Sequence, residues 1–182
     1  VGMLRENYEK FCRIAPEKLK PEYCWQTWYT DSNYALPFGK VRKRGTLYLE
    51  AKSHRLAENG FYVDIFPYDV VSPDAEQRQE TAGRLLKIYR TKLMKSHYQP
   101  WRENEKILWK KRIGYLYYQA LALFSDRESL AKAYDTLATA LPENGYVCEQ
   151  SAMTKPDAYE KAWCQALTDV VFEGETFKAP AE

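Results

Sequence analysis

Polar and apolar residues alternate along much of the first third of the chain, and this alternation is typical of β-strands. A helical pattern spans residues 4–14, and Pro16 and Pro21 should end it. Pro67 should likewise end the most apolar strand. The strands expected here, separated by turns at 31–33 and 58–60, are residues 23–30, 38–44, 46–50 and 61–66. Residues 38–44 and 46–50 are read as two strands or as one strand kinked at Gly45.

From residue 74 the spacing of apolar residues changes from two to about 3.6, which predicts helices. Ser125 should cap the last of them, with Glu128 completing a capping box. The elements expected are helices at 74–96, 103–124 and 125–141, strands at 146–149 and 168–172, and a helical turn or two near 157–164. The side of the middle helix expected to face the core consists of Trp109, Ile113, Leu116, Ala120, Leu123 and Phe124. A strand-rich first third followed by a helical block predicts an α+β fold.

The composition narrows the classes of function. The 182 residues amount to about one domain, and 27 Lys and Arg against 25 Asp and Glu give a net charge of +2. A charge so close to zero argues against a general nucleic-acid coat or a disordered chain. No apolar run approaches the roughly 18–20 residues of a membrane-spanning helix. With two histidines and four cysteines that form no CxxC pair, zinc sites and Ser-His-Asp triads are poor candidates, and reduced thiols are expected.

Asp64 is the first candidate for chemistry, because it interrupts an apolar strand between Val63 and Ile65. Side chains alternate along a strand, so Asp64 should point away from these two neighbours. An ionised carboxylate is costly to bury without a cation or donors, and metal-dependent phosphoryl transfer uses strand-borne carboxylates to bind Mg²⁺. An aspartate that pairs with an arginine or caps a backbone amide is the alternative. Asp69 is expected in a turn after Pro67.

The second candidate is the basic row Lys40-Val41-Arg42-Lys43-Arg44. In a strand, Lys40, Arg42 and Arg44 share a face at intervals of about 6.6–7 Å. Such a row can bind a diphosphate, since arginine offers a fork of donors and lysine a point charge. A solvated edge strand, where lysine deters aggregation, is the alternative.

Aromatic residues surround this row. Their faces could stack a nucleobase or enclose a quaternary ammonium group, although a hydrophobic core is the more common role. Basic and aromatic residues interleave at 23–48, which makes nucleic-acid binding a further option, but no RNP-type pattern is present. The residues concerned are Tyr23, Trp25, Trp28, Tyr29, Tyr34 and Phe38.

Several motifs occur in an order that resembles one family. They are Gly2-Met3-Leu4-Arg5-Glu6-Asn7-Tyr8, Asp31-Ser32-Asn33-Tyr34, Pro37-Phe38-Gly39-Lys40-Val41-Arg42, Asn59-Gly60-Phe61, Val63-Asp64-Ile65-Phe66-Pro67-Tyr68-Asp69 and Phe172-Glu173-Gly174. The family is LicD, and the likeness covers nearly the whole chain. Its most specific part is the Lys-x-Arg motif followed by Asp-Ile-Phe-Pro-x-Asp.

LicD proteins are similar to the nucleotidyltransferase superfamily, with a mixed sheet flanked by helices, and the fukutin-related enzymes share the domain. The resemblance implies transfer of phosphocholine, or a related phospho-substituent, from a CDP-linked donor such as CDP-choline to a sugar of a cell-surface glycan, for example teichoic acid or lipopolysaccharide. Asp64 matches a family carboxylate, so it is expected to be catalytic and to bind Mg²⁺ or Mn²⁺. Lys40 and Arg42 match the motif expected to bind the donor diphosphate, and Arg5 is a further phosphate-contact candidate. The cytoplasm, or the inner face of the membrane, is the implied location, with no nucleic-acid partner.

This sequence departs from the family pattern at both ends. The family's Asp-x-Asp motif would precede Val1, and a C-terminal piece would follow Pro180, so the first two metal carboxylates are missing here. We therefore expect a single LicD-like domain over residues 1–182 that is truncated at both ends and inactive alone. The alternative is a non-catalytic module that binds sugar phosphates or glycans.

Overall fold

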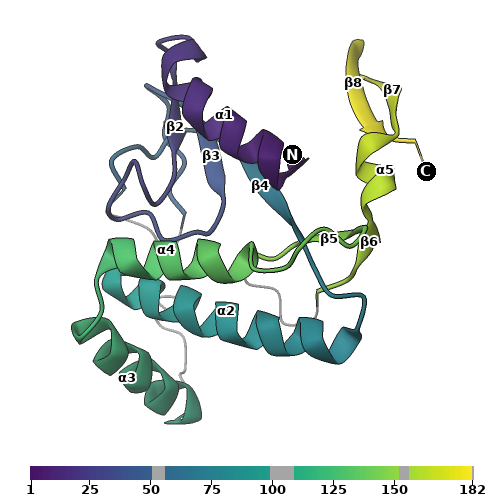
Figure 1. Ribbon diagram of the computed structural model, residues 1–182. Helices are drawn as coiled ribbons and strands as arrows, with labels where there is room; N and C mark the ends of the chain where they lie inside the picture. Colours follow the sequence, from purple (N-terminus) through teal and green to yellow (C-terminus); the bar gives the residue numbers. More distant parts are fainter. Residues whose placement is uncertain (51–55, 99–108, 152–155, 182) are drawn as a thin grey trace.

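The described residues form a six-stranded mixed sheet, a two-stranded hairpin and five helices, so the expected α+β class is confirmed (Figure 1). The computed structural model describes residues 1–50, 56–98, 109–151 and 156–181. The strand order is β2-β3-β4-β5-β6, with β1 parallel to β4 and the other neighbours antiparallel. The strands of this sheet are β1 Gly2–Leu4, β2 Tyr23–Gln26, β3 Gly39–Lys43, β4 Tyr62–Val70, β5 Tyr146–Glu149 and β6 Tyr159–Glu160. The helices are α1 Arg5–Lys18, α2 Ala75–Lys95, α3 Trp109–Leu123, α4 Arg127–Ala138 and α5 Lys161–Gln165.

Helix α1 packs against one face of the sheet, where Ala15 lies in a core with Trp25 and Ile65. The sequence predicts that this helix ends before Pro16, but it continues through that residue to Lys18. Proline removes one N–H donor from the helix. Burial of the apolar side on the sheet supplies the stability that local propensity lacks.

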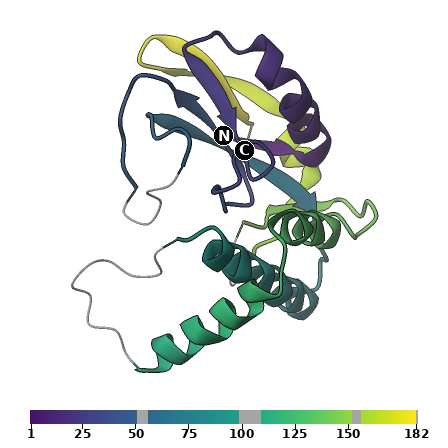
Figure 2. The same cartoon turned by 90° about the vertical axis from the view of Figure 1, so that its left-hand side faces the viewer.

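A second core lies between the segment after β2 and helices α2 and α4, and Trp28, Tyr34, Leu85 and Tyr134 are buried in it. The rings of Trp28 and Tyr134 meet edge to face with centroids 5.3 Å apart. Helix α2 lies between α4 and α3 (Figure 1). Figure 2 shows α3 on the side of α2 that is remote from the sheet.

Strand β4 is the longest strand of the sheet, and it does not end at Pro67 as the sequence predicts. Residues 62–65 pair with β3 and residues 68–70 pair with β5, so Pro67 falls between the two pairings. A proline in a strand costs the ladder a donor, but at this position neither antiparallel neighbour needs one. The strand therefore passes from one partner to the other without a break.

Two other predicted features are wrong. Residues 46–50 form no strand; Tyr48 N–H instead donates to the Asn59 carbonyl at 2.6 Å. Ser125 does not cap α4, because the side chain of Asp126 accepts from Ser129 N–H at 2.9 Å and performs that role one residue later.

The predicted inner face of the middle helix is also wrong over the described residues. Trp109, Ile113, Leu116, Leu123 and Phe124 are all exposed. Helix α3 instead turns Ala122 inward and packs on α2. The start of the predicted helix, residues 103–108, lies outside the described part of the chain.

The C-terminal part forms a separate hairpin of β7 Leu167–Phe172 and β8 Glu175–Pro180, the second of which the sequence pattern did not predict. The four cysteines are free, and Cys148 is the buried one. Within the described residues, no helix combines the length and apolar character that crossing a membrane requires.

Candidate functional site

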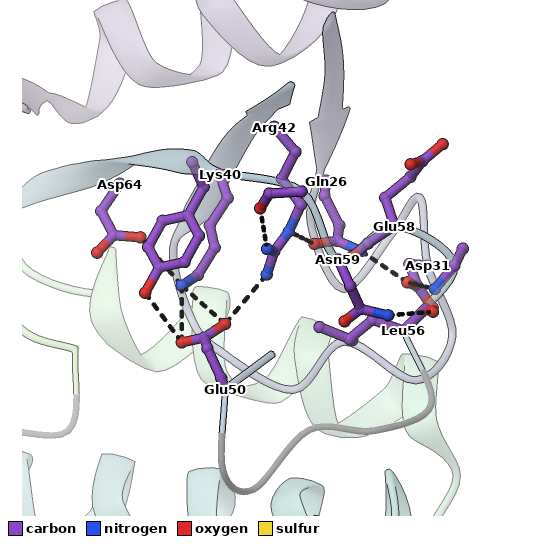
Figure 3. Close-up of polar contacts among 12 residues, drawn as sticks. Gln26, Asp31, Lys40, Arg42, Glu50, Leu56, Glu58, Asn59 and Asp64 are labelled. Carbon is purple, nitrogen blue, oxygen red and sulfur yellow. Dashed lines mark hydrogen bonds and ion pairs between the residues drawn. The ribbon is translucent and has the colours of Figure 1, made fainter. Parts of the chain in front are cut away.

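Strands β3 and β4 bring two of the candidate groups together. Their antiparallel register places Lys40 opposite Asp64 and Arg42 opposite Tyr62. Side chains of opposed residues project from the same face of a sheet, so the cations and the acid share one face (Figure 3). Arg44, the third member of the predicted row, lies beyond the end of β3 and is exposed.

The ammonium group of Lys40 is buried, with 2% of its side chain exposed. Its Nζ lies 3.1 Å from Glu50 Oε1 and 3.3 Å from Asp64 Oδ1. It also lies over two aromatic rings, 3.3 Å from the centroid of Tyr62 and 5.9 Å from that of Phe38. Carboxylates and ring faces together replace the water that this charge loses on burial.

Arg42 is equally buried, and hydrogen-bond acceptors surround its guanidinium group. Nε donates to Gln26 Oε1 at 2.5 Å, Nη1 to the Gly60 carbonyl at 2.9 Å and Nη2 to Glu50 Oε2 at 3.1 Å. The amide of Gln26 in turn donates to Asp31 at 2.9 Å. The bonds to Gln26 and Gly60 connect β2, β3 and the loop before β4. The remaining Nη2 group of Arg42 donates to Glu50.

Glu50 bridges both cations through its two carboxylate oxygens. Oε1 accepts from Lys40 and from the Tyr62 hydroxyl at 3.1 Å each, and Oε2 accepts from Lys40 at 3.2 Å and Arg42 at 3.1 Å. Burial alone would raise the pKa of Glu50, but the charge of Lys40 and these hydrogen bonds hold it below its usual value. Burial and the Glu50 charge raise the pKa of Tyr62 to about 12, so its hydroxyl remains a donor.

Asp64 is half-buried and its carboxylate pairs with Lys40. Its backbone carbonyl accepts from the amino group of Val1 at 2.7 Å. The two cations and the carboxylates of Glu50 and Asp64 balance in charge, so these four groups together carry no net charge. An anionic ligand must therefore compete with Glu50 for Lys40 and Arg42.

Arg5 lies on the other face of the sheet. Its guanidinium group donates to both oxygens of Asp69, at 2.5 and 2.6 Å, and lies 3.6 Å from Asp135. Asp69 is inside β4 and buried, so the prediction of a turn after Pro67 is wrong. Because Asp69 is five residues from Asp64, alternation puts the two carboxylates on opposite faces. The structure does not bring Arg5 to Lys40 and Arg42.

The predicted aromatic group divides between packing and surface. Trp25, Trp28 and Tyr34 are buried in the two cores. Tyr29 is exposed, and its hydroxyl donates to Asp135 at 2.7 Å. Phe38 is the member of the group that lies beside Lys40.

The residues that the structure describes do not fit a divalent-metal site. No group of three or more His, Cys, Asp or Glu side chains in that part of the chain is placed to hold a metal ion. Asp64, the predicted ligand, already faces the ammonium of Lys40. A cation at this carboxylate would lie against a like charge, which is unfavourable.

Gln26 and Glu50 complete the arrangement, and neither is assigned a role in the sequence analysis. The alternation of strand 23–30 places Gln26 on one face, but only the pairing of β2 with β3 shows that Lys40 lies opposite it. Glu50 lies in a segment predicted as a strand, and its carboxylate reaches Lys40 because that segment is irregular. Neither contact has a signal in the spacing of residues.

Comparison with known proteins adds no relative. The chain matches no protein-family model, and searches of curated proteins and of solved structures give no match either.

Proposed function

We propose that the chain is the donor-binding core of a LicD-like phosphotransferase, in which Lys40 and Arg42 bind the diphosphate of a CDP-linked donor such as CDP-choline. The observation that carries the proposal is that Lys40 and Arg42 hold the Glu50 carboxylate between them. With the Tyr62 hydroxyl, they make four hydrogen bonds to it of 3.1 to 3.2 Å. A site that holds two carboxylate oxygens in this way offers donors suited to two phosphate oxygens.

In the reaction that the resemblance implies, a sugar hydroxyl of a cell-surface glycan attacks the phosphorus that carries choline. The bond from that phosphorus to the bridging oxygen breaks, cytidine monophosphate leaves, and the hydroxyl proton is released to solvent. Lys40 and Arg42 would stabilise the charge that develops on the leaving phosphate. We assign no step to Mg²⁺ or Mn²⁺, because Asp64 is paired with Lys40. We therefore propose that this chain binds donor without turning it over, in the cytoplasm or at the inner face of the membrane.

A non-catalytic module that binds sugar phosphates or glycans is the second candidate. It is favoured by one observation, which is that the described residues offer no cluster of metal-ligating side chains. The two candidates share the cations of β3 and differ in the ligand, which is a CDP-linked donor in the first and a glycan or sugar phosphate in the second.

Calorimetric titration of CDP-choline, with and without Mg²⁺, separates the two. The transferase proposal expects CDP-choline to bind the wild-type chain with or without Mg²⁺, and Asp64→Asn, which removes a carboxylate from Lys40, to bind it at least as tightly. Asp169→Asn is the matched control, since Asp169 lies in the separate hairpin and pairs with exposed Lys178. Metal-independent binding of glycan would favour the module, and the lack of any donor binding would contradict the transferase proposal. Robust release of cytidine monophosphate by the isolated chain would refute the proposed inactivity.

A further inference from the structure

Helix α3 carries an exposed apolar stripe. At about 100° per residue, Trp109, Ile113, Leu116 and Tyr117 fall on one side of the helix, and Leu123 continues that side at its end. All five are exposed, and Phe124, the next residue, is 92% exposed. A continuous exposed stripe of large apolar side chains is unusual on a protein surface and marks a binding surface.

Cations border this stripe on both sides. Lys110 and Arg112 are exposed, and the helical period places one on each flank of the stripe. Helix α3 contains three basic residues and no acidic one. An apolar stripe flanked by basic residues, with Trp and Tyr among its members, is the pattern of helices that lie in the interface of a membrane.

Helix α2 adds positive charge behind α3. The ammonium of Lys87 lies 5.8 Å from the centroid of the Tyr117 ring, and the guanidinium of Arg90 lies 5.7 Å from that of Tyr118. Both cations belong to the helix on which α3 packs. The basic character of this side of the molecule therefore extends beyond α3 itself.

We propose that α3 binds the surface of a membrane rich in anionic phospholipids, with its apolar stripe in the acyl–headgroup boundary and Lys110 and Arg112 among the headgroups. The helix has 15 residues and is about 22 Å long, which is too short to span a hydrocarbon core of about 30 Å. It would lie parallel to the surface. This inference rests on α3 and its neighbours and is independent of donor binding by Lys40 and Arg42.

Charge favours a lipid surface over a protein partner. The cores of protein interfaces are depleted of lysine, whereas a headgroup layer accepts long basic side chains at the edge of an apolar stripe. Each Lys or Arg near an anionic bilayer strengthens binding about fivefold. Lys110 and Arg112 lie where both can contribute together with the stripe.

Flotation with vesicles of equal parts phosphatidylglycerol and phosphatidylcholine tests the proposal, and vesicles of phosphatidylcholine alone are the lipid control. We expect binding to the anionic vesicles that weakens with salt and with the loss of charge. Leu116→Asp should weaken it about tenfold or more, and Lys110→Gln with Arg112→Gln about twentyfold or more. The matched control is Val171→Asp, because Val171 is 70% exposed and Leu116 is 61% exposed.

Circular dichroism checks that each variant is folded. If Leu116→Asp does not fold, the double variant Lys110→Gln with Arg112→Gln still tests the proposal. Equal binding to neutral and anionic vesicles, or unchanged binding by either α3 variant, would overturn the proposal. A dimer in light scattering that Leu116→Asp abolishes, without binding to vesicles, would show that the stripe contacts a second copy instead. If an α3 variant loses vesicle binding but still binds CDP-choline in calorimetry, the proposed function is unaffected.

Discussion

At the scale of single residues, two clusters pair buried cations with carboxylates. Lys40 and Arg42 meet Glu50, and Arg5 meets Asp69. Burying an ion without a partner lowers the free energy of unfolding by roughly several kcal/mol. The two clusters lie on opposite faces of the sheet, and we expect them to have different roles. We expect the Arg5 cluster to stabilise the fold, whereas Glu50 covers two cations that we propose bind a ligand.

We expect Arg5→Met to destabilise the fold by about 3–5 kcal/mol, because it leaves Asp69 buried and charged. Arg13→Met, on an exposed position of α1, should change the free energy of unfolding little. Urea titration of both variants measures the difference. Adding Asp69→Leu to Arg5→Met should recover most of the loss. A near-neutral Arg5→Met would show that the ion pair does not hold α1 to β4.

The raised pKa of Glu149 predicts that the stability of the fold depends on pH. Burial raises its pKa from 4.5 to about 7, against the hydrogen bond from Ser151 N–H. The folded state thus holds a proton that the unfolded state releases above its pKa of 4.5. By linkage, the contribution of Glu149 to stability is fully present below that value and is lost as the pH rises through about 7.

Glu149→Gln removes this ionisation and should therefore raise the melting temperature at pH 8 while leaving it nearly unchanged at acid pH. Glu143→Gln is the comparison, because the pKa of exposed Glu143 is lowered, chiefly by a hydrogen bond from Lys161. An equal effect of Glu149→Gln at both pH values would contradict the assignment.

At the scale of elements, the sequence patterns locate most helices and strands because local periodicity produces them. The strand at 146–149 and the helix at 74–96 appear nearly as expected. The errors arise where tertiary contacts override local rules. Pro67 is tolerated in β4 because it falls between two antiparallel pairings. The strand expected at 46–50 is replaced by contacts of the Glu50 side chain and the Tyr48 backbone. Neither cause is visible in spacing alone.

The start of α4 can be tested at a single cap. Asp126→Ala should lower the melting temperature by about 2–4 °C, because Ser129 N–H loses its acceptor. Ser125→Ala should have a smaller effect, since the Ser125 hydroxyl donates to the Leu121 carbonyl and caps nothing in α4. Differential scanning calorimetry of the two variants decides between the caps. A larger loss in Ser125→Ala would restore the capping box that the sequence predicts.

At the scale of the whole molecule, strand pairing determines which candidate residues meet. Alternation predicts that Lys40 and Arg42 share a face, but the register that sets Lys40 opposite Asp64 is a property of the folded sheet. The resemblance makes Arg5 a further phosphate-contact candidate, yet α1 carries it to the opposite face and to Asp69. Long-range contacts such as Glu50 with Arg42 depend on loop conformation and cannot be derived from residue spacing.

The central claim is that Lys40 and Arg42 form an oxyanion site that Glu50 occupies in the absence of ligand. Isothermal titration of inorganic pyrophosphate into Glu50→Gln tests it most directly, with Glu58→Gln as the control, since Glu58 contacts only exposed Arg44 among the ion pairs of the described residues. Unit charges about 4 Å apart near a surface interact by several kcal/mol, so we expect Glu50→Gln to bind pyrophosphate about tenfold more tightly than the wild type. Equal or weaker binding by a folded Glu50→Gln would contradict the account.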